Sequence, residues 1–403
     1  MATGAIDAGL RGWRAPCGVV AVVFAAAAAA WGAPEPSTVP MVRARNRILV
    51  PVEVARPGTG AGPGTGAGPQ TGAYPFLLDT GAGHVVVDVR LAEAAGWAQA
   101  EAMDAAGAAR IAEGLRPAAA MRVAGYAVRG DVCLVADLSA FREQLGVEVM
   151  GVLPGVSLPG PVTLDFAAGR MTVYGPAPAM GRIPLRLDGD GAAVVDGLID
   201  GRYMRSFAID TMLGASVALS ERGAAALSVL GPDVRRLAIE AAGAPAASAA
   251  PDGAVQIRLG EIRVGGAALE RPVCAVTPRG PARLGVGFLA RFRPTLDFVN
   301  GSLWLEPVGD EPPEDGPVAG CGLTPARVVD GLWAVHVAEG SPAARAGIRP
   351  GDRIAEIDGA SMAGEAYEVV QGRLGGAAGG TVSVVVVQGV ESRSCELAVE
   401  ELL

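Results

Sequence analysis

The sequence predicts a mainly β protein with two tandem lobes followed by a small α+β domain. An apolar run ending in Asp-Thr occurs twice, at Phe76–Thr80 and Phe207–Thr211. The 403 residues include 58 glycines and 30 prolines but only 4% aromatic residues, a composition typical of many short strands joined by turns. A third ordered pattern of turns and apolar runs occupies residues 319–403. A chain of this length accommodates two or three such domains.

Charge and histidine content exclude several functions. The net charge of −9 offers no basic face, so neither nucleic acid nor an anionic membrane is expected as the main partner. The only histidines, His84 and His336, fall in different predicted domains. A serine or cysteine triad would therefore lack a base, and a zinc site would lack ligands. We expect no metal and no cofactor.

Residues 1–33 are predicted to be a signal peptide. Arg11 and Arg14 precede an apolar run of secretory length at residues 17–30, which is too short to cross a bilayer comfortably. The alternative is an uncleaved N-terminal anchor. Export would place the chain in the periplasm or outside the cell, and residues 34–46 are predicted to be a linker.

The two Asp-Thr motifs lie in a longer duplication. After each motif, three further segments recur in the same order. They are Met121–Gly125 with Ile262–Gly266, Val132–Cys133 with Val273–Cys274, and Thr163–Phe166 with Thr295–Phe298. Several segments that recur in the same order indicate a duplicated unit with changes in loop length, so we predict lobe one over residues 47–178 and lobe two over residues 179–308.

This duplicated pattern resembles the aspartic peptidase family, and more closely its bacterial retropepsin-like members with a trailing PDZ domain. The resemblance implies two acid-protease lobes of the closed β-barrel type and a catalytic dyad of Asp79 and Asp210. Two adjacent carboxylates cannot both ionise, so one acts as acid and the other as base on a bound water. Thr80 and Thr211 match the threonines that brace the two loops by hydrogen bonds.

Lobe two departs from the family pattern at Met212, where the family has glycine, as lobe one has at Gly81. A flexible side chain is expected to disturb the close approach of backbone to the dyad, so Met212→Gly is expected to raise activity. Two functions stay open: an exported aspartic endopeptidase acting as a monomer on polypeptides, and a binding protein on a peptidase fold with a decayed second site.

Three further segments of the lobes have expected roles. Residues 58–72 are predicted to form a low-complexity hairpin loop. Residues 107–120 match the position of the family's flap, and residues 241–251 are their counterpart. Val149–Leu153 and Leu284–Phe288 resemble the family's second signature, a glycine between apolar residues. His84 is expected either to line the cleft or to modulate the dyad.

Residues 319–403, after a linker at 309–318, resemble a PDZ domain. Gly320, Cys321, Gly322 and Leu323 match the loop that binds a peptide carboxylate, and Val335–Ile354 matches the bacterial PDZ core. The resemblance implies docking of C-terminal peptide tails beside a helix over 364–374.

The cysteines allow two interpretations. If the first and last strands of the PDZ domain are neighbours, Cys321 and Cys395 can form a disulfide, and with equal weight both are free thiols. Cys133 and Cys274 occupy equivalent repeat positions between apolar residues, so they are expected to be strand residues and not nucleophiles.

Overall fold

The computed structural model describes residues 34–44, 47–56, 70–95, 97, 110–111, 121–130, 133–189, 191–228, 237–240, 255–309, 313–327, 333–365 and 367–403. The predicted signal peptide, most of the 58–72 loop and nearly all of both flap candidates lie outside these residues. The chain divides into two units, 1–36 and 37–403, and only the second is treated below. No helix in the described residues is long and apolar enough to cross a membrane.

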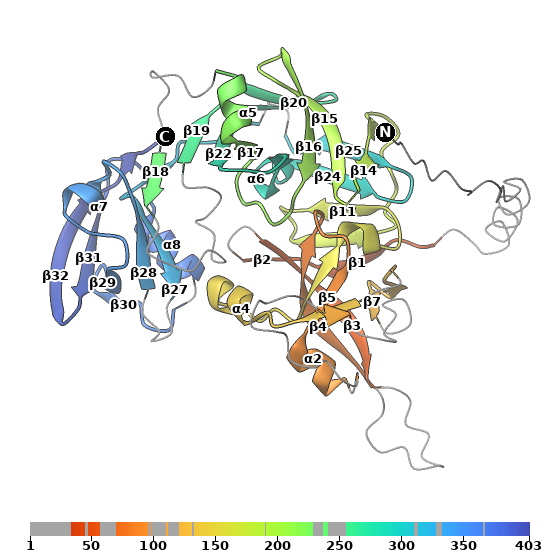
Figure 1. Cartoon of the computed structure of the whole chain (residues 1–403), viewed down its shortest axis with the longest axis horizontal. Helices are drawn as coiled ribbons and strands as arrows, with labels where there is room; N and C mark the ends of the chain where they lie inside the picture. The colour runs from red at the N-terminus through yellow and green to blue at the C-terminus, as the bar shows by residue number, and fades with distance from the viewer. Residues whose placement is uncertain are drawn as a thin grey trace, which may run out of the picture. The chain divides into compact units, whose positions relative to one another are not determined.

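Lobe one is built on a curled sheet that includes β3, β4, β5 and β7 (Figure 1). The strand order is β6-β9-β5-β10-β4-β3-β7-β8, and β2 also pairs with β3. Its elements are β2 (Val42–Ala44), β3 (Arg47–Arg56), β4 (Gln70–Asp79), β5 (Val85–Asp88), α2 (Val89–Ala94), β6 (Arg110–Ile111), β7 (Met121–Val123), β8 (Tyr126–Ala127), β9 (Cys133–Ala136), α4 (Ser139–Leu145), β10 (Gly151–Pro154) and the 3₁₀ helix η1 (Gly155–Ser157). The C-terminal part of β4 is buried on both faces, since Phe76 and Leu78 pack in the main core and Leu77 in a second cluster.

Lobe two repeats this plan, in the order β21-β20-β15-β16-β23-β17-β22-β19-β18. Its elements are β14 (Arg186–Leu187), β15 (Ala193–Ile199), β16 (Tyr203–Ile209), β17 (Val217–Ser220), α5 (Glu221–Ala226), β18 (Leu237–Glu240), β19 (Val255–Arg258), β20 (Glu261–Val264), β21 (Ala267–Glu270), β22 (Val273–Thr277), β23 (Ala282–Leu284) and α6 (Val286–Leu289). Beyond β18 the pairing continues into the C-terminal domain, because Ile239 lies opposite Ala338.

The strand pairing follows the predicted duplication. The parallel pair β4 and β10 of lobe one has its counterpart in β16 and β23 of lobe two. Cys133 and Cys274 occupy the same place in the parallel pairs β5 with β9 and β17 with β22. Both cysteines are buried strand residues, and burial raises the pKa of each thiol to about 12, which suppresses the nucleophilic thiolate.

The correspondence of Val149–Leu153 with Leu284–Phe288 is shifted in the structure. Leu153 lies opposite Leu78 in lobe one, and Leu284 lies opposite Ile209 in lobe two. Leu153 therefore matches Leu284, and the predicted match is four positions out of register. Short apolar runs with glycines can be aligned in several ways, and only the strand pairing fixes their register.

A six-stranded sheet joins the two lobes, in the order β1-β12-β11-β24-β25-β13. Its strands are β1 (Ser37–Pro40), β11 (Val162–Asp165), β12 (Arg170–Val173), β13 (Ile183–Pro184), β24 (Phe292–Asp297) and β25 (Ser302–Pro307). At its centre the duplicated residues Thr163 and Thr295 lie opposite each other, and their hydroxyls are hydrogen-bonded at 2.8 Å. The duplication is thus arranged about a pseudo-twofold axis through this pair.

Two predictions about this part of the fold are corrected. The barrels are not closed, because each lobe's sheet is a curled half-barrel whose end strands, β6 and β8 in lobe one, do not pair. The closed form was implied by family resemblance alone. The expected linker 34–46 contains β1 and β2, since Met41 and Ala44 are buried and β1 pairs with β12.

The C-terminal domain contains β26 (Ala319–Gly320), β27 (Leu323–Arg327), β28 (Trp333–Ala338), α7 (Pro342–Arg345), β29 (Arg353–Ile357), β30 (Ala360–Ser361), α8 (Tyr367–Leu374), β31 (Thr381–Gln388), β32 (Glu391–Ala398) and β33 (Glu400–Glu401). It has its own apolar core. Ser341 caps α7 by accepting a hydrogen bond from the amide of Ala344, and Pro342 occupies the first turn.

Of the two interpretations of Cys321 and Cys395, the structure supports free thiols, and the proposed disulfide is not formed. The N-terminal strand β26 pairs with β33, whereas Cys395 lies on β32 opposite Val384. Cys321 is buried, with its thiol donating to the carbonyl of Leu374 at 3.5 Å. Neighbouring terminal strands were therefore expected correctly, but the sequence did not reveal which residues of the last strands face β26.

Candidate functional site

The two Asp-Thr loops are joined by a reciprocal set of four hydrogen bonds. The Thr80 hydroxyl donates to the carbonyl of Ile209 at 2.6 Å and accepts from the amide of Thr211 at 3.1 Å. In return, the Thr211 hydroxyl donates to the carbonyl of Leu78 at 2.5 Å and accepts from the amide of Thr80 at 3.1 Å. Because both threonines are buried, this network fixes the two loops against each other.

Asp79 ends β4, and Asp210 follows directly after β16. Each carboxylate accepts a hydrogen bond at 2.8 Å from the amide two residues later, Gly81 for Asp79 and Met212 for Asp210. The two loops therefore hold their carboxylates in the same way. The residues Asp79, Thr80, Gly81, Asp210, Thr211 and Met212, selected from the sequence, are all brought together here.

The two carboxylates differ in their electrostatic surroundings. Burial, and after it the negative charge of Asp210, raise the pKa of Asp79 to about 6. The amides of Gly81 and Ala82 and the charge of Arg47 act in the opposite direction. Asp79 is therefore a carboxyl group that holds a proton at mildly acidic pH beside a second carboxylate, which suits general acid catalysis.

Sequence reasoning missed Arg283. This residue lies on β23, and its Nη1 contacts Oδ2 of Asp210 at 2.8 Å. The sequence did contain a signal, because a charged residue, Arg283, stands directly before the apolar run Leu284–Phe288.

Glycine is required directly after β23, where the chain passes behind the second loop. A Cβ at Gly285 would lie 2.2 Å from the carbonyl oxygen of Ala215 and 2.5 Å from that of Leu213. The close passage behind the loop, expected from the signature glycine, thus occurs at Gly285, the residue between β23 and α6.

Met212 does not occupy a position that needs glycine. Its side chain packs against the second apolar cluster of lobe one, which includes Leu77 and Val152. At the matching Gly81, an added Cβ would contact only the carboxylate of Asp79, at 3.4 Å. The physical reason for expecting Met212 to disturb the dyad is therefore absent from this geometry.

Met212→Gly is accordingly expected to lower the free energy of unfolding by about 2 kcal/mol without raising kcat/KM. The variant loses side-chain packing between the lobes and adds backbone entropy to the unfolded chain. Urea unfolding and peptide hydrolysis measure the two quantities, with Gly81→Ala as a matched loop variant of nearly unchanged stability. A gain in activity for Met212→Gly would show that the methionine restrains the loop.

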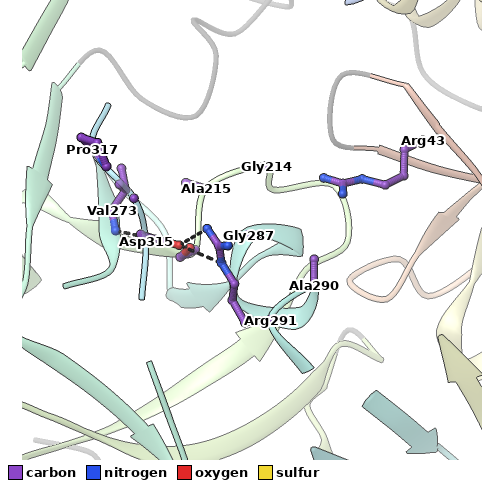
Figure 2. Close-up of a pocket in the computed structure, with 11 residues that line it drawn as sticks. Arg43, Gly214, Ala215, Val273, Gly287, Ala290, Arg291, Asp315 and Pro317 are labelled. Atoms are coloured by element: carbon purple, nitrogen blue, oxygen red, sulfur yellow. Dashed lines mark hydrogen bonds and ion pairs between the residues drawn. The ribbon is translucent and has the colours of Figure 1, made fainter. Parts of the chain in front are cut away.

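A cavity of about 500 Å³ lies behind the second loop, lined in part by Gly214, Ala215 and Arg43 (Figure 2). Asp315, from the predicted linker 309–318, is buried beside it. Its Oδ2 accepts from the Ser216 hydroxyl at 2.5 Å and the Val273 amide at 2.8 Å, and its Oδ1 accepts from Arg291 at 2.8 Å. The second half of the linker is therefore part of the support of lobe two.

In the C-terminal domain, the expected carboxylate-binding loop immediately precedes β27. Gly322 has a φ of +86°, and a Cβ there would lie 2.1 Å from Ser341, so glycine is required. The loop is fixed by bonds from Ala338 N to the carbonyl of Gly322 and from Ala343 N to that of Cys321. Helix α8 lies against β27, as the prediction of a helix over 364–374 requires.

Other candidates do not extend the site. His84 is exposed, and the described residues contain no cluster of three or more histidine, cysteine or acidic side chains that could hold a metal ion.

Comparison with known proteins identifies the C-terminal domain. Residues 334–388 match the PDZ domain family, so this part of the chain is a PDZ domain, a peptide-binding module. The family comparison gives no aspartic peptidase match. No curated protein matches the chain.

Among solved structures, the photosystem II D1 C-terminal processing protease aligns at 33% identity with a TM-score of 0.20. The alignment covers 22% of this chain and 24% of that protein, so the chain spans about a quarter of the protease's length.

Proposed function

We propose that the protein is an aspartic-type endopeptidase whose PDZ domain docks peptide tails. The observation that carries the proposal is the reciprocal threonine network, which sets Asp79 and Asp210 in equivalent loops facing one another. The charge of Asp210 acts on Asp79, as a dyad that shares one proton requires.

The reaction uses one protonated and one ionised carboxyl group. The ionised carboxylate takes a proton from a water whose oxygen bonds to the scissile carbonyl carbon, while the protonated carboxyl group gives its proton to the carbonyl oxygen. The C–N bond then breaks as the first group returns its proton to the amide nitrogen. The second group, which gave up its proton in the first step, takes a proton from a hydroxyl of the tetrahedral intermediate and is again protonated.

The test is hydrolysis of an unfolded protein between pH 3 and pH 8. Cleavage is expected to decline as pH rises through about 6, because Asp79 then loses its proton. Asp79→Asn is expected to abolish it, and Asp196→Asn, which alters an exposed carboxylate of lobe two, is expected to leave it unchanged. Cleavage that persists in Asp79→Asn would contradict the proposal and favour the alternative of a binding protein on this fold.

Export to the periplasm or the cell exterior remains part of the proposal, on the basis of the N-terminal sequence alone. The tails bound by the PDZ domain are proposed to enter between β27 and α8 and to place their carboxylate at residues Gly320–Leu323. This use of the groove follows from the position of the loop before β27.

A further inference from the structure

Arg283 breaks the symmetry between the two loops. It lies on β23 opposite Ala208 of β16. The equivalent residue of lobe one is Val152 on β10, opposite Leu77 of β4. Val152 is buried in an apolar cluster. Lobe one therefore presents a hydrocarbon side chain where lobe two presents a guanidinium, and the smaller Ala208 stands where lobe one has the larger Leu77.

The guanidinium of Arg283 forms a hydrogen bond with Asp210. Asp210 accepts from the amide of Met212 at Oδ1 and from Arg283 at Oδ2, both at 2.8 Å. Its side chain is only 12% exposed, and that of Arg283 is 30% exposed. An ion pair this sheltered from water is screened less than a surface pair, so the positive charge of Arg283 acts strongly on this carboxylate.

Three other influences act on the pair of carboxylates. Asp79 and Asp210 repel each other, and Arg47 of β3 acts on Asp79 through its charge. Burial is the largest influence on Asp79, and it favours the protonated form. Desolvation thus favours the protonated form of Asp79, whereas a positive charge is in direct contact only with Asp210.

We propose that Arg283 is a positioning residue that assigns the two roles in the dyad, keeping Asp210 as the base that deprotonates water and Asp79 as the acid that protonates the scissile carbonyl. This inference rests on the proposed function and deepens it. Each oxygen of Asp210 keeps a second lone pair beside its hydrogen bond, so the carboxylate can still accept the proton of the water. Without Arg283 the proton would be shared more evenly, as between two equivalent carboxyl groups.

The test is the pH dependence of kcat/KM for an internally quenched peptide. Arg283→Gln removes a positive charge in contact with the base, so the acidic limb of the profile is expected to move up by about one pH unit. At a pH on that limb, kcat/KM should fall about tenfold. Arg283→Met, which keeps the aliphatic stem, should give the same shift, and Arg283→Lys, which keeps the charge, should preserve the limb.

Arg186→Gln is the matched control, because Arg186 forms a two-point ion pair with Asp196 on the same lobe and its side chain is 52% exposed. The control removes the same charge from the lobe and should not move the limb. Thermal unfolding checks that each variant is folded, and a merely structural role would alter stability without moving the profile.

The outcomes separate this inference from the proposed function. An acidic limb in Arg283→Gln or Arg283→Met that coincides with that of Arg186→Gln would overturn the role of Arg283. So would an Arg283→Lys profile shifted as far as that of Arg283→Gln. Absence of Asp79-dependent cleavage in the wild-type protein would instead overturn the proposed function itself.

Discussion

Asp210→Asn is expected to lower kcat/KM for peptide hydrolysis by at least about 1,000-fold. An asparagine can still accept the hydrogen bond from the amide of Met212, but it cannot take a proton from water at the working pH. The ion pair with Arg283 is lost as well, and since Arg283 is partly exposed we expect the free energy of unfolding to fall by no more than about 2 kcal/mol. Hydrolysis of a quenched peptide near pH 5 and urea unfolding measure the two effects.

The control for this variant is Asp196→Asn, which makes the same chemical change at an exposed position of lobe two. Wild-type turnover in Asp210→Asn would mean that the dyad is not formed within one chain. Two copies of Asp79, contributed by the two chains of a homodimer, would then be the better model, and the molecular mass in solution would decide between them.

Thr80→Val is expected to lower the free energy of unfolding by about 3 kcal/mol. It is also expected to reduce kcat, because the loops that carry Asp79 and Asp210 are then held less firmly against each other. Valine has nearly the shape of threonine, so the change removes the hydroxyl with little change in packing. It leaves the carbonyl of Ile209 and the amide of Thr211 without their partner in a buried site. Each such group costs about 1–3 kcal/mol.

The control is the double variant Thr163→Val and Thr295→Val. These two hydroxyls bond to each other at the centre of the six-stranded sheet, so replacing both leaves no single partner behind. The double variant is expected to be nearly neutral. If Thr80→Val is no more destabilising than this control in urea unfolding, the threonine network does not hold the lobes together.

The sequence predicted the duplication because the two copies keep the same residues where they contact each other. Thr80 with Thr211, and Thr163 with Thr295, meet across the pseudo-twofold axis. A residue that must contact its own copy leaves a repeated signal in the sequence. The PDZ core was predictable for a similar reason, since the Ser341-Pro342 helix start and the glycine turns are local features.

The sequence could not predict features that depend on one copy alone or on strand register. Lobe one has Val152 at the position of Arg283, so a comparison of the two copies did not identify the arginine as a functional residue. Cys321 and Cys395 lie near paired terminal strands, but their distance depends on a register that residue types do not encode. The open edges of the half-barrels likewise depend on which strands pair at their ends.

Asp315 has a consequence for how the two kinds of domain can be separated. The residue precedes the PDZ domain in the chain, yet its carboxylate completes the hydrogen bonding of Ser216 and Arg291 in lobe two. A deletion that removes everything after residue 308 would strip the second loop of this support as well as removing the peptide-binding module. Lost activity would then be attributed wrongly to missing tail recognition. A cut after Pro317 keeps Asp315 in place and removes the PDZ domain together with the strand pairing between β18 and β28.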